Sequence, residues 1–410
     1  MTFEMNLEKY AELTVRVGLN IQNGQTLWIN APLHLPELVR HISKKAYEAG
    51  AKHVHIEWQD EICTQIKYKY APDKAFHDYP NWRAQAMEEL ADNNGAYLLI
   101  ESSDPELLKD VDSKRISDFS KAAGPKLVKW REAMSSYKMA WSIIGAPSSA
   151  WAKKVFPHLE ESAAIQALWD AIFKASRVDQ ENPVETWHAH NATLRSKREQ
   201  LNEKQYRKIH YRAPGTELTV ELPDNHVWRG GSATNGTAGF QFNPNIPTEE
   251  VFISPNKRGT HGTVRSTKPL SYQGNLIHNF TLTFENGRVV NYKAEQGFES
   301  LQAMIEMDEG SHYLGEIALV PHQSPISNSN LIFFNTLFDE NASNHLALGR
   351  SFPTCVQGGT SMSKEEQELA GLNHSLIHVD FMIGSAEMDI DGELADGRIE
   401  PIFRNGNWAF

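Results

Sequence analysis

The chain has 410 residues, of which 40% are hydrophobic and 22% are charged, and this is the usage of an ordinary globular protein. That composition excludes a disordered chain, a collagen-like chain and a small disulfide scaffold, and the length predicts two domains. The 40 basic residues are outnumbered by 52 acidic residues, and the net charge of −12 argues against a nucleic acid partner, because phosphate binding needs a basic surface.

The sequence also favours the cytoplasm over a membrane or an exported location. No segment approaches the roughly 20 apolar residues that a membrane helix needs. Residues 1–10 lack the basic start and the apolar stretch of a signal peptide. The two cysteines, Cys63 and Cys355, fit a reducing compartment. We therefore expect a cytoplasmic protein that binds neither membrane nor nucleic acid.

The first half of the chain alternates helical and extended patterns. Apolar residues at helical spacing predict a helix over residues 5–19. Further elements follow it, with strands predicted at residues 26–30, 52–58, 96–101 and 139–144 and helices at residues 36–50, 82–92 and 122–134. Helices then dominate from about residue 148 to residue 204. This alternation is typical of a mostly parallel sheet covered by helices, so we predict an α/β N-terminal domain over residues 1–205.

The second half has the pattern of strands and turns. Strands are predicted at residues 208–212, 217–222, 277–284, 288–294, 314–320 and 376–383, and helices at residues 297–307 and 363–370. Asn286 and Gly287, between two extended runs, predict a hairpin turn. We therefore predict a mainly β (α+β) domain over residues 206–410.

The clearest chemical pattern lies in the predicted strand at residues 376–383. Alternate residues of a strand share a face, so His378 and Asp380 should point the same way while their apolar neighbours enter a core. An imidazole and a carboxylate at this spacing suit a divalent metal ion. A solvated polar face is the alternative, because short patterns of this kind also occur by chance.

A rival pattern lies in the first half, where His53, His55 and Glu57 share one face of a predicted strand. The parallel-sheet context favours a partly solvated strand face for these three residues. The glycine-rich stretch at residues 229–239 lacks the spacing of a phosphate-binding loop, and we predict a turn-rich loop there. These interpretations place the candidate chemistry in the second half of the chain.

Further acidic residues of the second half have positions that suit a binding site. Glu249 and Glu250 follow a loop that contains Pro247. Glu316 lies within the apolar run at residues 314–320, where we expect it to be buried. A buried carboxylate needs a partner, and either a metal ion or an arginine would serve. His345 ends a polar loop and leads into an apolar segment.

Taken together, these motifs resemble the M29 family of metallo-aminopeptidases, and the resemblance runs along the whole chain. It rests on four motifs in order: Asn245-Ile246-Pro247-Thr248-Glu249-Glu250-Val251-Phe252, Gly315-Glu316-Ile317-Ala318-Leu319-Val320, Thr336-Leu337-Phe338-Asp339-Glu340-Asn341 with His345, and His378-Val379-Asp380. It implies an exopeptidase that removes N-terminal residues from peptides with broad specificity. Carried over by position, it also implies two divalent ions (zinc, cobalt or magnesium) held by five ligands: Glu250, Glu316, His345, His378 and Asp380.

The implied chemistry assigns further expectations to this chain. Two divalent ions about 3.5–4 Å apart would share a water that loses a proton near neutral pH and becomes the nucleophile. Glu249, next to a ligand, is a candidate proton shuttle, and a solvent-facing or turn-capping role is the alternative. The family resemblance also implies a homodimer with an enclosed cavity. The first half carries no chemistry of its own, so we expect it to shape access to the site and to support the dimer.

One position departs from the family pattern. Members usually have a tyrosine shortly after the metal-binding histidine, and this chain has Phe352 at that position. If the missing hydroxyl stabilised an oxyanion, its loss would lower the rate by about 10²–10³, and otherwise the effect would be small. Two alternatives therefore stay open. One is a different dinuclear metallohydrolase, and the other is a peptide-binding relative in which Phe352 has lowered the catalytic rate.

Overall fold

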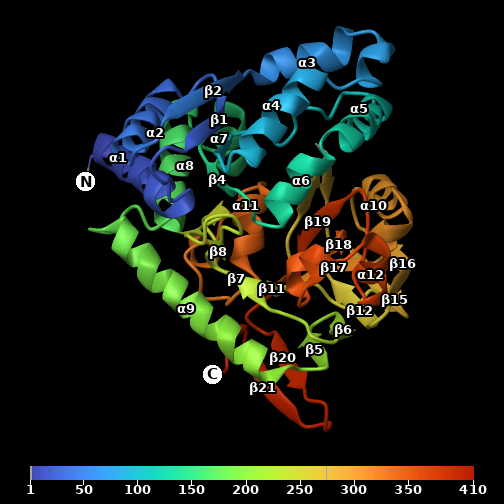
Figure 1. Cartoon of the computed structure of the whole chain (residues 1–410). Helices are drawn as coiled ribbons and strands as arrows, with labels where there is room; N and C mark the ends of the chain where they lie inside the picture. The colour runs from blue at the N-terminus through green and yellow to red at the C-terminus, as the bar shows by residue number, and fades with distance from the viewer. Residues whose placement is uncertain (1, 274) are drawn as a thin grey trace. The chain divides into compact units, whose positions relative to one another are not determined.

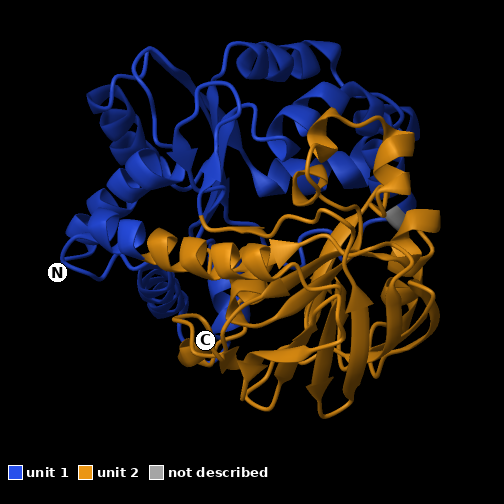
Figure 2. Cartoon of the chain, turned by 60° about the horizontal axis from the view of Figure 1, so that its bottom comes forward, with its two compact units in different colours: residues 1–189, 232–247 blue, residues 190–231, 248–410 orange. Residues whose placement is uncertain are grey.

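Residues 2–273 and 275–410 are described by a computed structural model, in which the chain forms two units (Figure 1, Figure 2). Unit 1 holds the residues up to Ala189 together with residues 232–247, and unit 2 holds residues 190–231 and 248–410. Helix α9 (Pro183–Lys204) therefore begins in unit 1 and ends in unit 2. The division into domains at residue 206, with separate roles for the two halves, stays a prediction.

Unit 1 is built on a five-stranded parallel sheet in the order β10-β4-β3-β1-β2. Its strands are β1 (Thr26–Pro32), β2 (His53–Gln59), β3 (Ala96–Glu101), β4 (Ala140–Gly145) and β10 (Asn245–Ile246). The first four match the predicted strands, and their parallel pairing confirms the predicted α/β fold. The fifth strand returns from the second half of the chain, where Asn245 pairs with Ile143 of β4.

Helices connect the parallel strands of unit 1 (Figure 1). They are α1 (Phe3–Leu13), α2 (Pro36–Glu48), α3 (Glu61–Tyr70), α4 (Asn81–Asp92), α5 (Ser113–Lys126), α6 (Val128–Ser135), α7 (Ser149–Val155) and α8 (Glu161–Ala175). A π-helical turn at Thr14–Gly18, a 3₁₀ turn at Asp73–Phe76 and the short strands β8 (Ala233–Thr234) and β9 (Gln241–Phe242) complete the unit. Among the described residues, no helix has both the length and the apolar character needed to cross a bilayer.

Helix α3 differs from the sequence-based expectation, which has no element at residues 61–70. The helix buries none of its residues, so no core-facing side of it could be recognised in the sequence. Its start is nevertheless well defined, because the Asp60 side chain accepts hydrogen bonds from the backbone N–H groups of Ile62 and Cys63.

Unit 2 consists mainly of two antiparallel sheets, which confirms the predicted mainly β second half. The five-stranded sheet has the order β19-β18-β17-β11-β7, and its strands are β7 (Arg229–Gly230), β11 (Val251–Ile253), β17 (Leu314–Leu319), β18 (His345–Gly349) and β19 (His378–Met382). The eight-stranded sheet has the order β16-β15-β12-β6-β5-β20-β21-β22. Its strands are β5 (Lys208–Ala213), β6 (Thr216–Glu221), β12 (Thr260–Arg265), β15 (Thr281–Glu285), β16 (Arg288–Lys293), β20 (Asp389–Glu393), β21 (Ile399–Arg404) and β22 (Asn407–Trp408).

The remaining elements of unit 2 are short. They are the strand pair β13 (Leu270–Tyr272) and β14 (Asn275–Ile277), the helices α10 (Phe298–Ile305), α11 (Thr336–Asp339) and α12 (Lys364–Leu369), and 3₁₀ turns at Glu309–His312, Ser327–Ser329, Glu340–Ala342, Pro353–Cys355 and Gly359–Ser361. Helices α10 and α12 match the two predicted helices. Asn286 and Gly287 form the predicted hairpin turn between β15 and β16, and both have positive φ, as this kind of turn requires.

Candidate metal centre

The five-stranded sheet of unit 2 has one polar face and one apolar face. Residues directly opposite in antiparallel strands share a face. The register pairs Ala347 with Asp380 and Gly349 with His378, and His345 lies two residues before Ala347 on the same side. The alternate residues of these strands enter the apolar core of the unit. Strand alternation therefore places both histidines and Asp380 on the polar face.

A β-bulge at Gly315 turns Glu316 toward that polar face. Strand β17 pairs Leu314 with Leu348 and Glu316 with Ala347, so its register shifts by one residue at Gly315. A regular strand would put Leu314 and Glu316 on one face, whereas the bulge sends Leu314 into the core and Glu316 to the site. A Cβ on Gly315 would lie 2.4 Å from each of two backbone carbonyl oxygens, so a glycine is required there.

The structure brings all five predicted ligands together: Glu250, Glu316, His345, His378 and Asp380. His345 Nε2 lies 3.2 Å from Glu250 Oε2, and His378 Nε2 lies 2.9 Å from Glu316 Oε2 and 3.4 Å from Asp380 Oδ1. Their ligand atoms form two groups, Glu250 with Glu316 and His345, and Glu316 with His378 and Asp380. Within each group the atoms lie within 4.8 Å of one another. Glu316 therefore belongs to both groups.

Backbone carbonyl oxygens fix the orientation of both imidazoles. His378 Nδ1 lies 2.7 Å from the carbonyl oxygen of Arg350, and His345 Nδ1 lies 3.2 Å from that of Ser343. A carbonyl oxygen only accepts, so each Nδ1 must carry the proton and donate. In the neutral tautomers the Nε2 lone pairs then point toward the carboxylates, which is the arrangement that a metal-ligating histidine requires.

The centre is buried and rich in negative charge. Burial, assisted by the charge of Glu250, raises the pKa of Glu316 to about 7. Burial opposes protonation of His345 and His378, but the surrounding carboxylates outweigh it, so the pKa of His345 is raised to about 10 and that of His378 also lies well above its ordinary value. The site therefore attracts positive charge, which a divalent ion would supply in place of protons. Carboxylate and imidazole donors fit such an ion.

Glu340 is a further acid of this centre, although no sequence pattern indicates a role for it. It opens the 3₁₀ turn at Glu340–Ala342, directly after α11, and it is buried. Burial, followed by the charges of Asp380 and Glu250, raises the pKa of Glu340 well above its ordinary value. It lies in a polar loop without periodicity, so the sequence shows that the residue is polar but not which way it points.

Glu249 has different partners from Glu250. Its backbone N–H donates to Asn341 Oδ1 over 2.7 Å, and its Oε2 lies 3.6 Å from His190 Nε2. The same His190 nitrogen lies 2.8 Å from the carbonyl oxygen of Thr248. Consecutive residues of an extended segment point to opposite sides, which explains why the two neighbouring glutamates contact different groups.

Phe352 lies beside a predicted metal ligand. Its ring centroid is 4.8 Å from that of His378 and 5.5 Å from that of Phe252, and both contacts are edge-to-face. Its backbone N–H donates to Ser254 Oγ over 2.8 Å. The position at which the family resemblance implies a tyrosine thus adjoins the centre, and its ring is held by aromatic contacts.

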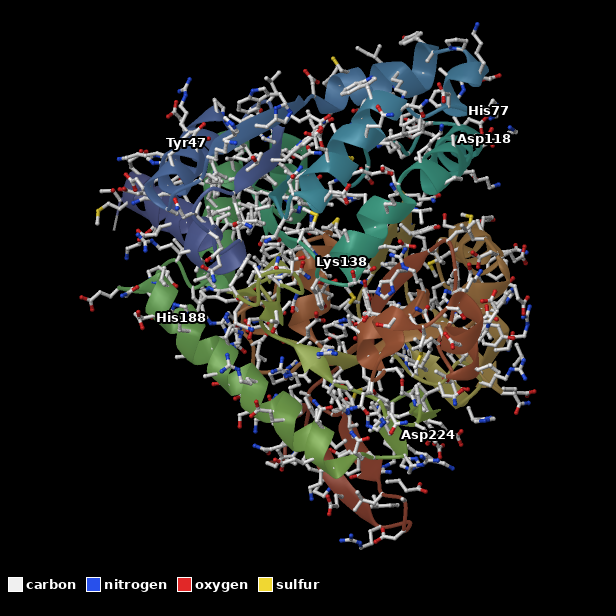
Figure 3. All side chains as sticks on the ribbon, in the orientation of Figure 1. Tyr47, His77, Asp118, Lys138, His188 and Asp224 are labelled. Atoms are coloured by element: carbon white, nitrogen blue, oxygen red, sulfur yellow. The ribbon has the colours of Figure 1, made fainter. Side chains whose placement is uncertain are left out.

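In the part of the chain that the structure describes, no other pair of a histidine and a carboxylate has a third potential metal ligand close to it. Glu57, in the rival pattern on β2, accepts two hydrogen bonds from the Arg83 guanidinium over 2.9 and 2.8 Å. In unit 1, His77 and Asp118 lie near each other on the surface, with Nε2 and Oδ2 3.8 Å apart (Figure 3). The predicted preference for the second half agrees with these contacts.

Comparison with known proteins identifies relatives along the whole length of the chain. The family described as thermophilic metalloprotease (M29) matches residues 3–408. Aminopeptidase 2 of Geobacillus stearothermophilus is 56% identical over 408 residues, covering 100% of this chain and 98% of that protein. Aminopeptidase T of Thermus aquaticus is 40% identical, covering 99% of each chain.

A solved structure has the same fold. Wild-type AmpT from Thermus thermophilus superimposes with a TM-score of 0.93 at 37% identity, covering 100% of both chains. Aminopeptidase T of Thermus thermophilus is also a sequence relative, at 39% identity over 407 residues.

Proposed function

Since the chain belongs to the M29 family and is a metallo-aminopeptidase, we propose that it removes the N-terminal residue from peptides with broad specificity, using two divalent metal ions. This proposal rests mainly on Glu316, because its carboxylate belongs to both groups of ligand atoms. One carboxylate between two sets of donors is the arrangement expected of a dinuclear centre.

The five ligand residues would divide between the two ions. Glu250 and His345 would hold one ion, His378 and Asp380 would hold the other, and Glu316 would bridge them. Zinc, cobalt or magnesium are the ions that the family resemblance implies. When bound, such ions lower the pKa of water and polarise a carbonyl group, and this is the chemistry that peptide hydrolysis needs.

Two carboxylates outside the ligand set are candidates for moving the proton from the attacking water to the departing amine. Glu249 is the candidate from the sequence, and its carboxylate faces His190. Glu340 is the candidate from the structure, because it is buried and its charge interacts with those of the ligands Asp380 and Glu250. Its Oε1 accepts a hydrogen bond from Asn341 Nδ2 over 3.3 Å. We propose Glu340 as the stronger candidate because it interacts with two of the ligands, whereas the Glu249 carboxylate faces His190.

The activity is tested with leucyl p-nitroanilide after treatment with a chelator. Zinc, cobalt and magnesium are added back separately, and N-acetyl-leucyl p-nitroanilide is assayed alongside. We expect restored cleavage of the free-amine substrate only. Cleavage of both substrates would favour a different metallohydrolase, and an absence of cleavage with every metal would contradict the proposed activity.

The number of ions is tested by metal analysis of purified variants. Glu316→Gln should lose both ions, because it removes the shared ligand, whereas His345→Ala and His378→Ala should each lose one. Glu309→Gln is the matched control, because Glu309 is a surface residue that pairs with Arg288. Retention of two ions in Glu316→Gln would contradict the proposed bridge.

A second candidate function, a peptide-binding protein with weakened catalysis, rests on Phe352. The ring lies against His378 but carries no hydroxyl that could stabilise a developing oxyanion. Intact ligands favour the active enzyme over this alternative. The homodimer, the cytoplasmic location and the access role of the N-terminal half remain predictions.

A further inference from the structure

Two arginines of unit 2 converge on strand β7. The Arg229 Nε donates to the carbonyl oxygen of Thr354 over 2.7 Å, which fixes the side chain of this strand residue. Arg198, on helix α9, reaches the neighbouring residue, where its Nη1 lies 3.4 Å from the carbonyl oxygen of Gly230. Both guanidinium groups are thus held by backbone carbonyl oxygens, that of Arg229 by Thr354 and that of Arg198 by Gly230.

Arg229 lies on the face of the sheet that carries the metal centre. The register pairs Arg229 with Phe252 in the neighbouring strand β11, so the two side chains share a face. Glu250 precedes Phe252 by two residues and belongs to the same side. Phe252 contacts Phe352, and Phe352 contacts His378. Ring contacts therefore lead from the metal centre to Phe252, and Arg229 is opposite Phe252 in the next strand.

The two positive charges lack a partner of opposite sign. In the part of the chain that the structure describes, neither Arg198 nor Arg229 forms an ion pair, although both are partly buried. Burial and then the charge of Arg229 lower the pKa of Arg198, and Glu199 opposes this effect only in part. Two adjacent, partly desolvated guanidinium groups are unfavourable alone and favour an anion between them.

We propose that Arg198 and Arg229 bind the C-terminal carboxylate of a short peptide substrate. The inference rests on the proposed aminopeptidase function, because it places the other end of the peptide at the metal centre. The ring centroids of His378, Phe352 and Phe252 are separated by steps of 4.8 and 5.5 Å. Since an extended chain covers about 3.3–3.6 Å per residue, about three residues of a peptide would span these two steps.

The test compares two substrates that differ only in the terminal charge. These are the tripeptide Leu-Gly-Gly and its C-terminal amide, assayed with metal-loaded protein. The quantity of interest is the ratio of kcat/KM for the free acid to that for the amide. We expect a ratio of about ten in the unmodified protein, since a bidentate charged contact is lost with the amide. Arg229→Gln and Arg198→Gln should each bring the ratio close to one.

Arg195→Gln is the matched control, because Arg195 lies on the same helix and is exposed. It should keep the ratio of the unmodified protein. The two test variants alter different elements, a strand and a helix, so misfolding of one leaves the other available. Calorimetric titration with Gly-Gly and with its amide provides a second measurement that does not depend on turnover, and the unmodified protein should bind the acid more tightly.

The outcomes separate this inference from the proposed function. Equal cleavage of acid and amide by the unmodified protein would overturn the carboxylate site and leave the aminopeptidase function intact. An unchanged preference for the acid in both test variants would also overturn it. If neither substrate were cleaved with any metal, the proposed function would fail, and the titration with Gly-Gly would still decide whether the arginines bind a carboxylate.

Discussion

The side chain of Asn341 holds the backbone of Glu249 through a hydrogen bond of 2.7 Å from the Glu249 N–H to Asn341 Oδ1. Its Nδ2 donates to the carbonyl oxygen of Leu337 over 3.0 Å and to Glu340 Oε1 over 3.3 Å. The fully buried amide thus connects the segment that enters β11 with the acid that we propose for proton transfer. Asn341 is therefore a positioning residue for both segments.

Replacing Asn341 tests this role. Asn341→Asp removes the donor to Glu340 and places a second carboxylate beside it, so the apparent pKa of the acidic limb in the pH profile of kcat should rise. Asn341→Ala should weaken metal binding and activity by about 10–100-fold, as is usual for groups that orient a metal site. The measurements are pH–rate profiles and metal titrations.

The control is Asn235→Ala, which removes an equally buried asparagine that accepts hydrogen bonds from Thr237 and Ala238 in unit 1. This variant should lose stability without a change in the pH profile. A shift of the same size in both variants would show that the effect of Asn341 is general destabilisation.

Phe352→Tyr should increase the rate. The Phe352 ring packs edge-to-face against His378 and is only partly buried, and a tyrosine would keep this ring and add a hydroxyl. If it donates to the developing oxyanion, kcat for leucyl p-nitroanilide should rise by about tenfold or more, with little change in KM. Phe298→Tyr adds the same hydroxyl to an exposed ring of helix α10 and serves as the control. Equal rates in Phe352→Tyr and the unmodified enzyme would remove the oxyanion role.

Much of the fold followed from periodicity, because buried strands and core-facing helices leave regular apolar patterns. Helix α3 was missed, since it buries none of its residues and so has no core-facing side. The return of β10 to the parallel sheet could not be predicted either, because a two-residue strand carries no period. Such pairings depend on contacts between distant segments, which a pattern along the chain does not report.

The candidate site was predictable to a similar extent. Alternation along β19 correctly placed His378 and Asp380 on one face. A buried acid was expected at Glu316, but the bulge at Gly315 that turns it toward the site left no signal beyond the glycine itself. Glu340 was missed because an irregular loop has no period from which an orientation can be derived. The grouping of five ligands came from the family resemblance rather than from any single pattern.

The stability of unit 2 should depend on the ionisation of Asp308. Burial alone would raise the pKa of Asp308, but hydrogen bonds from Leu376, Ser375 and Ser311 outweigh burial and hold the pKa below its ordinary value. The folded state therefore binds the proton less tightly than the unfolded state. This stabilising contribution is complete above the ordinary aspartate pKa of about 4 and is lost as the pH falls through the lower folded value.

Denaturant unfolding of the unmodified protein and of Asp308→Asn at several pH values checks this dependence. The difference in unfolding free energy between them should be constant above about pH 5 and should shrink below about pH 4. Asp110→Asn, which replaces an exposed aspartate, is the control and should show no such change. A difference that grew on acidification would reverse the predicted sign.

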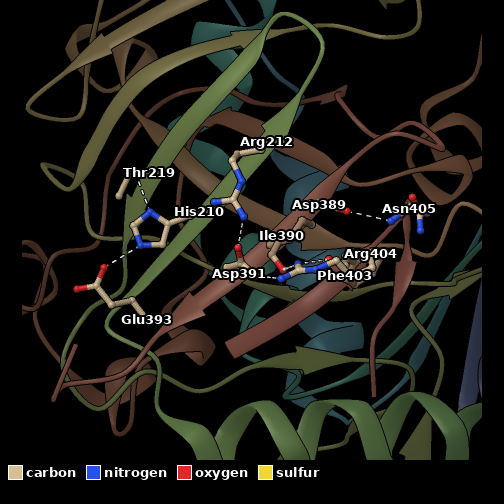
Figure 4. A network of polar contacts seen from close by, with 10 residues as sticks. All are labelled: His210, Arg212, Thr219, Asp389, Ile390, Asp391, Glu393, Phe403, Arg404 and Asn405. Atoms are coloured by element: carbon tan, nitrogen blue, oxygen red, sulfur yellow. Dashed lines mark hydrogen bonds and ion pairs between the residues drawn. The ribbon is translucent and has the colours of Figure 1, made fainter. Parts of the chain in front are cut away.

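Asp391 should be the main ionic contribution to stability in the sheet of β20 and β21. The residue is 2% exposed, and its carboxylate is bound by the guanidinium groups of Arg212 and Arg404, the latter over 2.5 Å (Figure 4). Asp391→Ala leaves both arginines without this acceptor, so we expect a loss of about 2 kcal/mol in the free energy of unfolding, measured in urea.

On the same hairpin, Asp396 pairs with Arg398 over 2.7 Å, but both side chains are exposed. Because water screens exposed pairs, Asp396→Ala should leave stability unchanged within error, and equal losses in the two variants would contradict the role of burial.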